Sequence, residues 1–566
     1  MEFDGAGIGS GIAIGPVVRM AEPLPAPTDR QSHLPAEHER ERASAALSVV
    51  AAELQDRGAR AGGAAREVLE AQAMFAEDPT IAERIDASTA TGKTAERAVY
   101  EAFASYREIL SGLGGYMAER AADLDDVSQR AIAHLLKLPA PGVPNPGHPF
   151  VLVARDLAPA DTALLDLGQV LAVVTIEGGP TSHTAILARE KSITAIVGTS
   201  GAGVLADGDL VIVDAENSVV VTEPTAAAVA AAEERIAARQ ARAAAPAGPG
   251  RLADGTPVPL LANLGSADGA IAAIGAGAEG VGLFRTEFLF LDAATAPSVT
   301  MQQEQYTRLL GAFPGRKVVV RVLDAGADKP LAFLTDAEEE NPALGRRGLR
   351  ALRAKETILR EQLTALAAAD AASDTDLWVM APMVSTVEEA RYFTALAHEL
   401  GIRTAGVMVE VPSAALLADR MLSVTDFASI GTNDLTQYTL AADRLLGSVA
   451  GFQDPWNPAV LRLVSEVGAA GRSTGKPVGI CGEAAADPLL AVVLVGLGAT
   501  SLSMSPSALA DVRESLARFT LDDAKTLAEA ALAAESATEA HTAAKSLAAD
   551  LQRARTAAPA TASREA

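Results

Sequence analysis

One histidine in this chain lies in a sequence that suits transfer of a phosphoryl group. The string Gly-Gly-Pro-Thr-Ser-His occupies positions 178–183, between an apolar run typical of a buried strand and a helix-favouring stretch. The glycines predict a tight turn, and Thr181 or Ser182 is the expected N-cap. His183 is then expected in the first helical turn, where free N–H groups and the helix dipole would hold a phosphoryl group on its imidazole. A lone histidine near a cap is more often an ordinary surface residue, so the whole string is what favours a phosphohistidine.

Further charged residues stand at the ends of apolar runs in the second half of the chain. Glu410 and Asp434 are two such residues, and paired carboxylates suit Mg²⁺, which fills its other positions with water and substrate oxygens. Arginines at similar positions suit a substrate with both a carboxylate and a phosphate, because guanidinium binds either group in a bidentate manner. They are Arg285, Arg321 and Arg444. Each residue alone is equally consistent with an ordinary ion pair, and only the set indicates a site.

The elements that would position this set form a repeating pattern. Eight apolar runs, each followed by helical sequence, occupy 258–264, 280–288, 317–323, 377–383, 404–411, 427–431, 477–481 and 501–504. Eight βα units in about 300 residues predict a (β/α)₈ TIM barrel, whose active site lies at the carboxyl ends of the strands. We expect the barrel at 251–545, with a charged excursion after the third strand and a flexible tail at 546–566.

The first half predicts an α/β domain that carries the histidine. Residues 1–24 and 141–223 supply its strands, and the helical pattern of 25–140 predicts a bundle inserted between them. Residues 224–250 read as a linker helix that ends in a Pro/Gly-rich hinge. The fold class is therefore multidomain α/β, with a phosphohistidine domain, an inserted helical bundle, a linker helix and a barrel.

Composition restricts the partners and the compartment. The net charge of −25 argues against a nucleic-acid or anionic-membrane partner and favours a basic protein partner, if any. A single cysteine excludes an internal disulfide and fits a reducing cytoplasm. The first residues lack the features of a signal peptide, and the most apolar run, 488–499, is shorter than the roughly 20 residues that span a bilayer. We expect a cytoplasmic protein without membrane insertion.

Four motifs make the chain similar to a known family. They are Gly-Leu-Phe-Arg-Thr-Glu-Phe at 282–288, Val-Met-Val-Glu-Val-Pro at 407–412, Gly-Thr-Asn-Asp-Leu-Thr-Gln-Tyr at 431–438 and Gly-Ile-Cys-Gly-Glu at 479–483. With the histidine string, they resemble the Enzyme I family of phosphoenolpyruvate-utilising enzymes, the phosphoenolpyruvate–protein phosphotransferases of the bacterial sugar phosphotransferase system. The resemblance covers nearly the whole chain.

The resemblance implies a reaction and its residues. His183 would take a phosphoryl group from phosphoenolpyruvate with Mg²⁺, release pyruvate, and pass the group to a histidine of the carrier protein HPr, which starts sugar uptake phosphorylation. The metal ligands would be Glu410 and Asp434, and Cys481 would protonate the enolate of pyruvate. The substrate would be bound by Arg285, Arg321, Asn433 and Arg444, with Arg347 as a weaker candidate.

The resemblance also implies partners. The helical insertion would bind HPr, and the barrel would form a homodimer, for which the apolar run 489–497 is additional motivation because it is richer than one barrel helix needs. Pro180 stands where a polar or basic residue is expected, and Ala325 and Ala327 flank Gly326 in the third-strand motif. Neither departure removes a reacting group.

Three alternatives differ from this prediction. A pyruvate phosphate dikinase or phosphoenolpyruvate synthase shares the histidine segment and the barrel, but it needs a nucleotide-binding domain that we do not expect here. A nitrogen-regulatory relative carries an additional sensory domain before the histidine domain. A scaffold without activity would not need the reactive residues that this chain retains.

Overall fold

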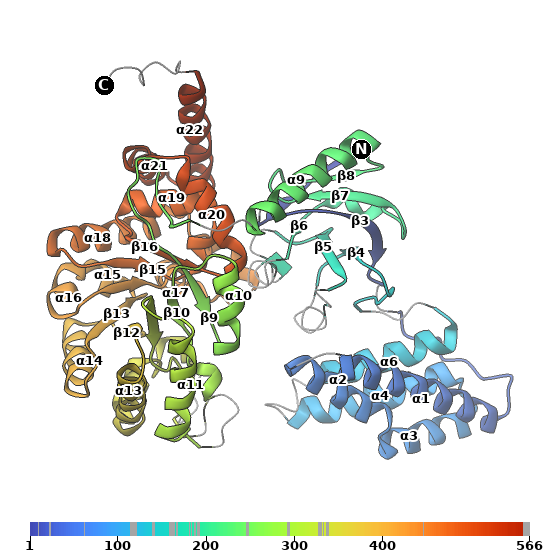
Figure 1. The fold of residues 1–566 in the computed structure, drawn as a ribbon. Coiled ribbons are helices and arrows are strands. Elements are labelled where there is room, and N and C mark those ends of the chain that lie inside the picture. Colours follow the sequence, from blue (N-terminus) through green and yellow to red (C-terminus); the bar gives the residue numbers. More distant parts are fainter. Residues whose placement is uncertain are drawn as a thin grey trace. The chain divides into compact units, whose positions relative to one another are not determined.

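The computed structural model describes residues 1–9, 11–21, 24–60, 63–113, 121–138, 142–157, 165, 168–179, 182, 184–185, 188, 193–244, 248–290, 295–326, 331, 333–334, 339–444 and 447–557. The chain forms two compact units, Met1–Ala237 and Ala238–Ala566 (Figure 1). The border between them lies inside α9 (Ala226–Ala244), the helix expected to link the two halves.

The first unit contains a mixed sheet in the order β1-β8-β7-β3-β4-β5-β6-β2. The strands β3 to β6 run parallel, and the remaining neighbours pair antiparallel. The buried strand β5 confirms the run expected before the glycine turn. The strand bounds are β1 (Glu2–Asp4), β2 (Ala6–Ile8), β3 (Ile12–Arg19), β4 (Phe150–Ala154), β5 (Val170–Thr175), β6 (Ala195–Val197), β7 (Leu210–Asp214) and β8 (Val219–Thr222).

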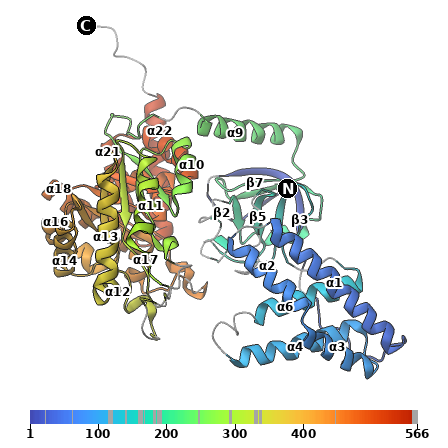
Figure 2. The same ribbon diagram turned by 60° about the horizontal axis from the view of Figure 1, so that its bottom comes forward.

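A helical bundle enters the chain between β3 and β4, as the sequence predicted. Figure 2 shows its helices packed side by side. The core between them is apolar and includes Leu54, Ile81 and Phe103. Asp78 caps α3 by accepting from the Thr80 N–H, with proline at the first helical position. The helices are α1 (Ala36–Arg60), α2 (Gly63–Ala76), α3 (Pro79–Ala90), α4 (Ala95–Leu113) and α6 (Ala121–Leu136).

The second unit is a closed barrel of eight parallel strands, which confirms the predicted (β/α)₈ architecture. Apolar side chains fill its interior, among them Leu283, Val319, Met380 and Met408. All strands except the last are shorter than the apolar runs, because the ends of those runs lie outside the sheet, whereas the last strand has the bounds of its run. The strands are β9 (Leu260–Leu264), β10 (Val281–Phe284), β11 (Lys317–Arg321), β12 (Asp376–Ala381), β13 (Thr404–Val409), β14 (Ala428–Ile430), β15 (Val478–Ile480) and β16 (Ser501–Met504).

Helices surround the barrel strands in Figure 1. Those that follow the first four strands are α10 (Ala270–Gly275), α11 (Val299–Gly311), α12 (Leu349–Ala354), α13 (Glu356–Ala371) and α14 (Val387–Glu399). The remaining ones are α15 (Pro412–Leu416), α16 (Ala418–Val424), α17 (Thr432–Leu440), α18 (Pro458–Thr474), α19 (Pro488–Leu497), α20 (Leu509–Ala517), α21 (Leu521–Ala533) and α22 (Ala537–Ala557). Every helix among the described residues is too short or too polar to span a lipid bilayer.

The prediction of a flexible tail at 546–566 is wrong for residues 546–557. Helix α22 continues to Ala557, and residues 558–566 lie outside the described part of the chain. Ala540, Ala544 and Ala548 recur every fourth residue and are buried against the barrel core. The alanine-rich composition that suggested a frayed end is therefore a helix with one small-residue face.

The apolar helix α19 is covered within the same chain. Its residues from Leu490 to Val495 are buried, and α21 packs against it so closely that a side chain at Gly496 would begin 2.1 Å from the carbonyl oxygen of Ala524. The richness of this helix in apolar residues is thus explained without a second copy. The apolar run therefore does not support a homodimer, and the prediction of a homodimer rests on the family resemblance alone.

Candidate active site

The carboxyl ends of β10 and β11 present buried opposite charges. Arg321 is the last residue of β11 and is 6% exposed. Its guanidinium forms ion pairs with Glu287, which follows β10, and with Asp324, at 3.0 Å between Nη1 and Oδ2. Buried charges persist when they are paired. These contacts fix Arg321 at the strand end where the sequence predicted a substrate-binding group.

Arg347 connects Asp324 to a further carboxylate, that of Asp434. It follows the short 3₁₀ turn Pro342–Leu344 and is 3% exposed. Its Nη1 donates to Asp434 Oδ1 at 2.9 Å and to the Tyr438 hydroxyl at 3.2 Å, while Nη2 donates to Asp324 Oδ2 at 3.2 Å. The weaker of the predicted substrate residues therefore lies at the centre of the cluster, between a carboxylate that follows β11 and one in the first turn of α17 (Thr432–Leu440).

Burial and charge oppose each other at the arginines of this cluster. Burial tends to lower the pKa of Arg321 and of Arg347, but the nearby carboxylates outweigh it and raise both pKa values above the ordinary value of arginine. At Glu410, burial and the charges of Asp434 and Asp324 act together and raise the pKa. The ion pairs thus gather several carboxylates around two guanidinium groups, an arrangement that suits a cation.

Glu410 has one satisfied and one unsatisfied oxygen. It follows β13 and is fully buried, and its Oε1 accepts the Met383 N–H at 2.7 Å. Its Oε2 is buried and has no hydrogen-bond partner within the described residues. A buried acceptor without a partner is costly, and a bound cation would remove that cost. A side chain at position 431 would begin 2.8 Å from Oε2, so Gly431 leaves the space beside this oxygen open.

The other predicted substrate residues lie at the rim. Arg285 directly follows β10, is half-buried, and its guanidinium forms no hydrogen bond or ion pair with the described part of the chain. Arg444 approaches Asp434, with 3.5 Å between Nη1 and Oδ2. Asn433 is bound elsewhere: its amide exchanges two hydrogen bonds with Glu483, at 3.1 and 3.2 Å. The structure thus joins Arg444 to the cluster and turns Asn433 toward a neighbouring loop.

Cys481 is a buried thiol at the end of β15. It is 2% exposed, and its Sγ donates to the carbonyl oxygen of Ile430 at 3.5 Å. Burial raises the pKa of the thiol to about 11, although a hydrogen bond with Ser429 acts in the opposite direction. The group therefore retains its proton at neutral pH, as a proton donor must.

A buried amide network supports the strand ends from behind. Gln362 on α13 accepts the Leu323 N–H at 2.9 Å and donates to Thr286 Oγ1 and Tyr306 OH at 3.2 and 3.0 Å. The Thr286 hydroxyl donates in turn to the carbonyl oxygen of Arg321 at 3.0 Å. The backbone around Arg321 is therefore held by side chains that have no charge of their own.

His183, Thr181 and Pro180 lie outside the described residues, but parts of the surrounding segment are described. Ser182 Oγ accepts the Ala185 N–H at 3.3 Å, which is the contact expected of an N-cap. The Thr184 hydroxyl is buried and donates to Asp156 Oδ1 at 3.0 Å. Gly178 has a φ of +90°, a conformation that favours glycine in the turn after β5. These contacts agree with the predicted strand, turn and helix.

Comparisons with known proteins match nearly the whole chain. Family models of phosphoenolpyruvate-utilising enzymes match as the N-terminal domain at 4–120, the mobile domain at 146–218 and the phosphoenolpyruvate-binding domain at 239–521. The phosphoenolpyruvate–protein phosphotransferase of Streptomyces coelicolor is 53% identical over 548 residues, which cover 96% of this chain and 98% of the relative. The chain belongs to the phosphoenolpyruvate–protein phosphotransferases. Relatives of the same name include those of Haloferax volcanii, 40% identical with 85% and 86% of the two chains covered, and Geobacillus stearothermophilus, 36% identical with 94% and 96% covered.

Several residues in and around the cluster of arginines and carboxylates were not predicted as site residues from the sequence. Glu287 and Asp324 do stand at strand ends, so their positions were visible, but nothing in the sequence shows that they pair with Arg321. Tyr438 is part of a quoted motif and was given no role. The supporting amide of Gln362 lies on an outer helix, where no motif marks it.

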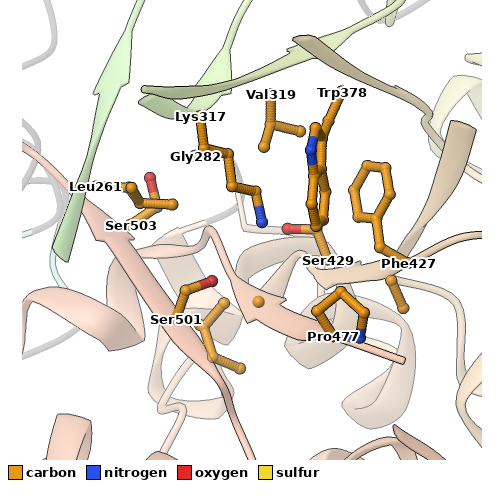
Figure 3. Close-up of a pocket in the computed structure, with 13 residues that line it drawn as sticks. Leu261, Gly282, Lys317, Val319, Trp378, Phe427, Ser429, Pro477, Ser501 and Ser503 are labelled. Carbon is orange, nitrogen blue, oxygen red and sulfur yellow. The ribbon is translucent and has the colours of Figure 1, made fainter. Parts of the chain in front are cut away.

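The phosphotransferase barrel also contains a cavity at the opposite, amino-terminal end of its strands. Lys317, the first residue of β11, extends along the ring of Trp378 with Phe427 beyond it (Figure 3). Its Nζ lies 3.4 Å from the Trp378 ring centroid and 5.8 Å from that of Phe427. Burial lowers the pKa of Lys317 to about 8, although the charge of Asp376 opposes the shift. This cavity is separate from the cluster of arginines and carboxylates.

Replacing this lysine is expected to stabilise the barrel at pH 7. Because the folded pKa is about 8 and the ordinary value is 10.5, the unfolded chain binds more protons between these values, and wild-type stability rises with pH across that window. Lys317→Met should therefore raise the melting temperature at pH 7 by about 2–4 °C, with a smaller advantage at pH 10. Calorimetry at both pH values measures the difference. If the melting temperature of Lys317→Met exceeds that of wild type by the same amount at both pH values, the buried charge of Lys317 is not what destabilises the wild-type barrel.

Proposed function

We propose that this phosphotransferase phosphorylates itself on His183 from phosphoenolpyruvate with Mg²⁺, releases pyruvate, and passes the phosphoryl group to a histidine of HPr. In this role it would start the phosphorylation that accompanies sugar uptake. The observation that carries the proposal is the buried cluster at the barrel mouth. Guanidinium groups and carboxylates meet there around Arg347, beside one carboxylate oxygen, Oε2 of Glu410, that has no partner in the described chain.

The carboxylates of the cluster fit Mg²⁺. Glu410 and Asp434 would hold the ion, because Mg²⁺ takes one or two protein carboxylates and leaves its other positions to water and substrate. The free oxygen of Glu410 supports this assignment. When bound, the ion would neutralise negative charge on the phosphoryl and enolate oxygens.

The arginines fit the donor substrate. Phosphoenolpyruvate carries a phosphate and a carboxylate, and guanidinium can bind both. Arg285 would contribute most directly, since its guanidinium is not engaged by the described residues. Arg321, Arg347 and Arg444 would keep their carboxylate contacts and offer their remaining N–H groups, and Asn433 would join them if its contact with Glu483 opens.

The transfer would proceed in two balanced steps. An imidazole nitrogen of His183 attacks phosphorus, and the P–N bond forms as the bond between phosphorus and the enol oxygen breaks. The electron pair leaves on the enolate, whose methylene carbon takes the proton of Cys481 to give pyruvate, and the thiolate regains a proton from water before the next turnover. In the second step a histidine of HPr attacks the same phosphorus and restores the imidazole of His183. The Ser182 cap and the bond between Thr184 and Asp156 would orient the segment.

The partners follow from the same proposal. The helical bundle at 25–140 would bind HPr, and residues 224–250 would act as a linker and hinge, since the histidine and the barrel cluster belong to different units. We propose a cytoplasmic homodimer formed through the barrel. A net charge of −25 favours a basic partner surface.

The direct test combines the purified protein with labelled phosphoenolpyruvate, Mg²⁺ and purified HPr. We expect label to appear first on the protein and then on HPr, and both steps to be independent of ATP. Turnover that requires ATP would indicate a dikinase or synthase instead. Label that stays on the protein when HPr is added would refute the proposed acceptor.

Cys481→Ser is expected to slow pyruvate formation about 100-fold or more, as loss of a general acid does. Exchange of phosphate between HPr and the protein should continue at the wild-type rate, because that half-reaction has no enolate to protonate. Pyruvate release and phosphate exchange are measured on the same preparation. Equal losses in both half-reactions would point to a folding defect and contradict the acid role.

A further inference from the structure

One residue beside the metal candidates has an unusual backbone conformation. Five non-glycine residues have positive φ within the described chain, and Met383 is one of them, with φ of 55°. It lies just after β12 and its side chain is buried. A left-handed conformation is costly for a residue with a Cβ, and it persists where the surrounding structure requires it.

The conformation of Met383 has a specific result. It directs the Met383 N–H to Oε1 of Glu410, at 2.7 Å. The second oxygen of the same carboxylate, Oε2, is buried and lacks a hydrogen-bond partner in the described chain. The backbone bond therefore occupies one oxygen of Glu410 and leaves the other available.

A second left-handed residue packs against the first. Gly348 directly follows Arg347 and has φ of 57°. A Cβ at this position would lie 2.9 Å from the Cβ of Met383 and 3.2 Å from Asp324 Oδ1, so only glycine fits without a shift. The adjacent Leu349 N–H points to the Pro382 carbonyl at 3.4 Å. The loop that carries Arg347 thus braces the turn that orients Glu410.

We propose that Met383 is a positioning residue for the cation, because its left-handed backbone holds Glu410 with Oε2 directed to the metal. The proposal rests on the proposed function, in which Glu410 is a metal ligand. The side chain of Met383 contributes packing, and the backbone conformation contributes the orientation. Any substitution that cannot adopt positive φ should therefore weaken metal binding.

Two isomeric substitutions separate these contributions. Leucine and isoleucine have the same volume and similar hydrophobicity, but β-branching makes positive φ far more costly for isoleucine. We expect Met383→Ile to weaken Mn²⁺ binding about tenfold or more, and Met383→Leu to leave it within about twofold of wild type. Mn²⁺ alone is the probe, and its free fraction is measured from the electron paramagnetic resonance signal of the full-length protein. Melting temperatures are measured in parallel.

Further variants distinguish an error in the proposed metal ligand from an error in the proposed positioning role. Glu410→Gln should lose Mn²⁺ binding, and if it binds as wild type does, the proposed ligand is wrong. If Glu410→Gln fails to bind while Met383→Ile and Met383→Leu bind equally, the positioning role is wrong. Should Met383→Ile not fold, Met383→Gly serves instead, since glycine adopts positive φ freely. It should bind Mn²⁺ as wild type does despite a lower melting temperature, and a loss of binding there would overturn the proposal.

Discussion

His183→Ala is expected to abolish acid-labile labelling of the protein by phosphoenolpyruvate. The label would be a phosphoramidate, which needs an imidazole nitrogen, and alanine supplies no nucleophile. Alanine also favours the helix, and the cap contact between Ser182 and the Ala185 N–H does not involve the histidine side chain. The folded structure should therefore survive the substitution. Labelling is measured before and after acid treatment, with circular dichroism as the check on folding.

His398→Ala is the matched control for this experiment. His398 lies on α14, where its ring contacts the Ile402 carbonyl oxygen and Asp426. Neither contact belongs to the cluster of arginines and carboxylates, so the control should label as wild type does. Full labelling of His183→Ala would show that another residue carries the phosphoryl group.

The second large effect is expected from Arg347→Met, which should lower kcat/KM for phosphoenolpyruvate about 1000-fold or more. The guanidinium lies between Asp324 and Asp434, at 3.2 and 2.9 Å. Its removal takes the shared cation from two buried carboxylates, which keep only their contacts with Arg321 and Arg444. The loss of one member of a buried ion pair typically costs about 3–5 kcal/mol. The carboxylates would then repel the anionic substrate that the arginine should attract.

Arg346→Met is the neighbouring control, because Arg346 is exposed where Arg347 is buried. Its activity should stay within about twofold of wild type, as surface substitutions usually do. Arg347→Lys keeps the charge but cannot reach both carboxylates as a guanidinium does, so an intermediate loss is expected. Phosphate exchange with HPr should be unaffected in all three variants. If Arg347→Met has the KM and kcat of wild type, Arg347 has no role in substrate binding or catalysis.

Those features of the barrel that depend on short-range pattern could be predicted from the sequence. Apolar β-type runs alternate with helical ones, and this order leaves few arrangements other than a barrel of parallel strands. Because the carboxyl ends of such strands meet at one face, Arg321, Glu410 and Asp434 could be expected to lie near one another. In the structure, Asp324 forms ion pairs with both Arg321 and Arg347. Arg347 also pairs with Asp434, so a chain of ion pairs connects Arg321 to Asp434.

Features that depend on long-range contacts could not be predicted. Arg347 lies in a long excursion, and no periodicity shows that this loop folds back to Asp434. The conformation of Met383 has no signal in its residue type, since methionine rarely adopts positive φ. The part of α22 from residue 546 onward has the simple composition of a tail, and only the packing of this helix against the barrel core shows that it is ordered structure.

The two edges of the amino-terminal sheet have a consequence for the order in which the protein can assemble during synthesis. The edge strands β1 and β2 both come from residues 2–8, yet they pair with β8 and β6, as in the contacts Glu2↔Val221 and Ala6↔Val197. Neither edge can close until most of the first unit has been translated. The described helices of the bundle, α1 to α4 and α6, contact one another and can form early. Strands β1 and β2 precede the rest of this unit in the chain but are among its last strands to find their partners, and the sheet stays open at both sides while the bundle folds.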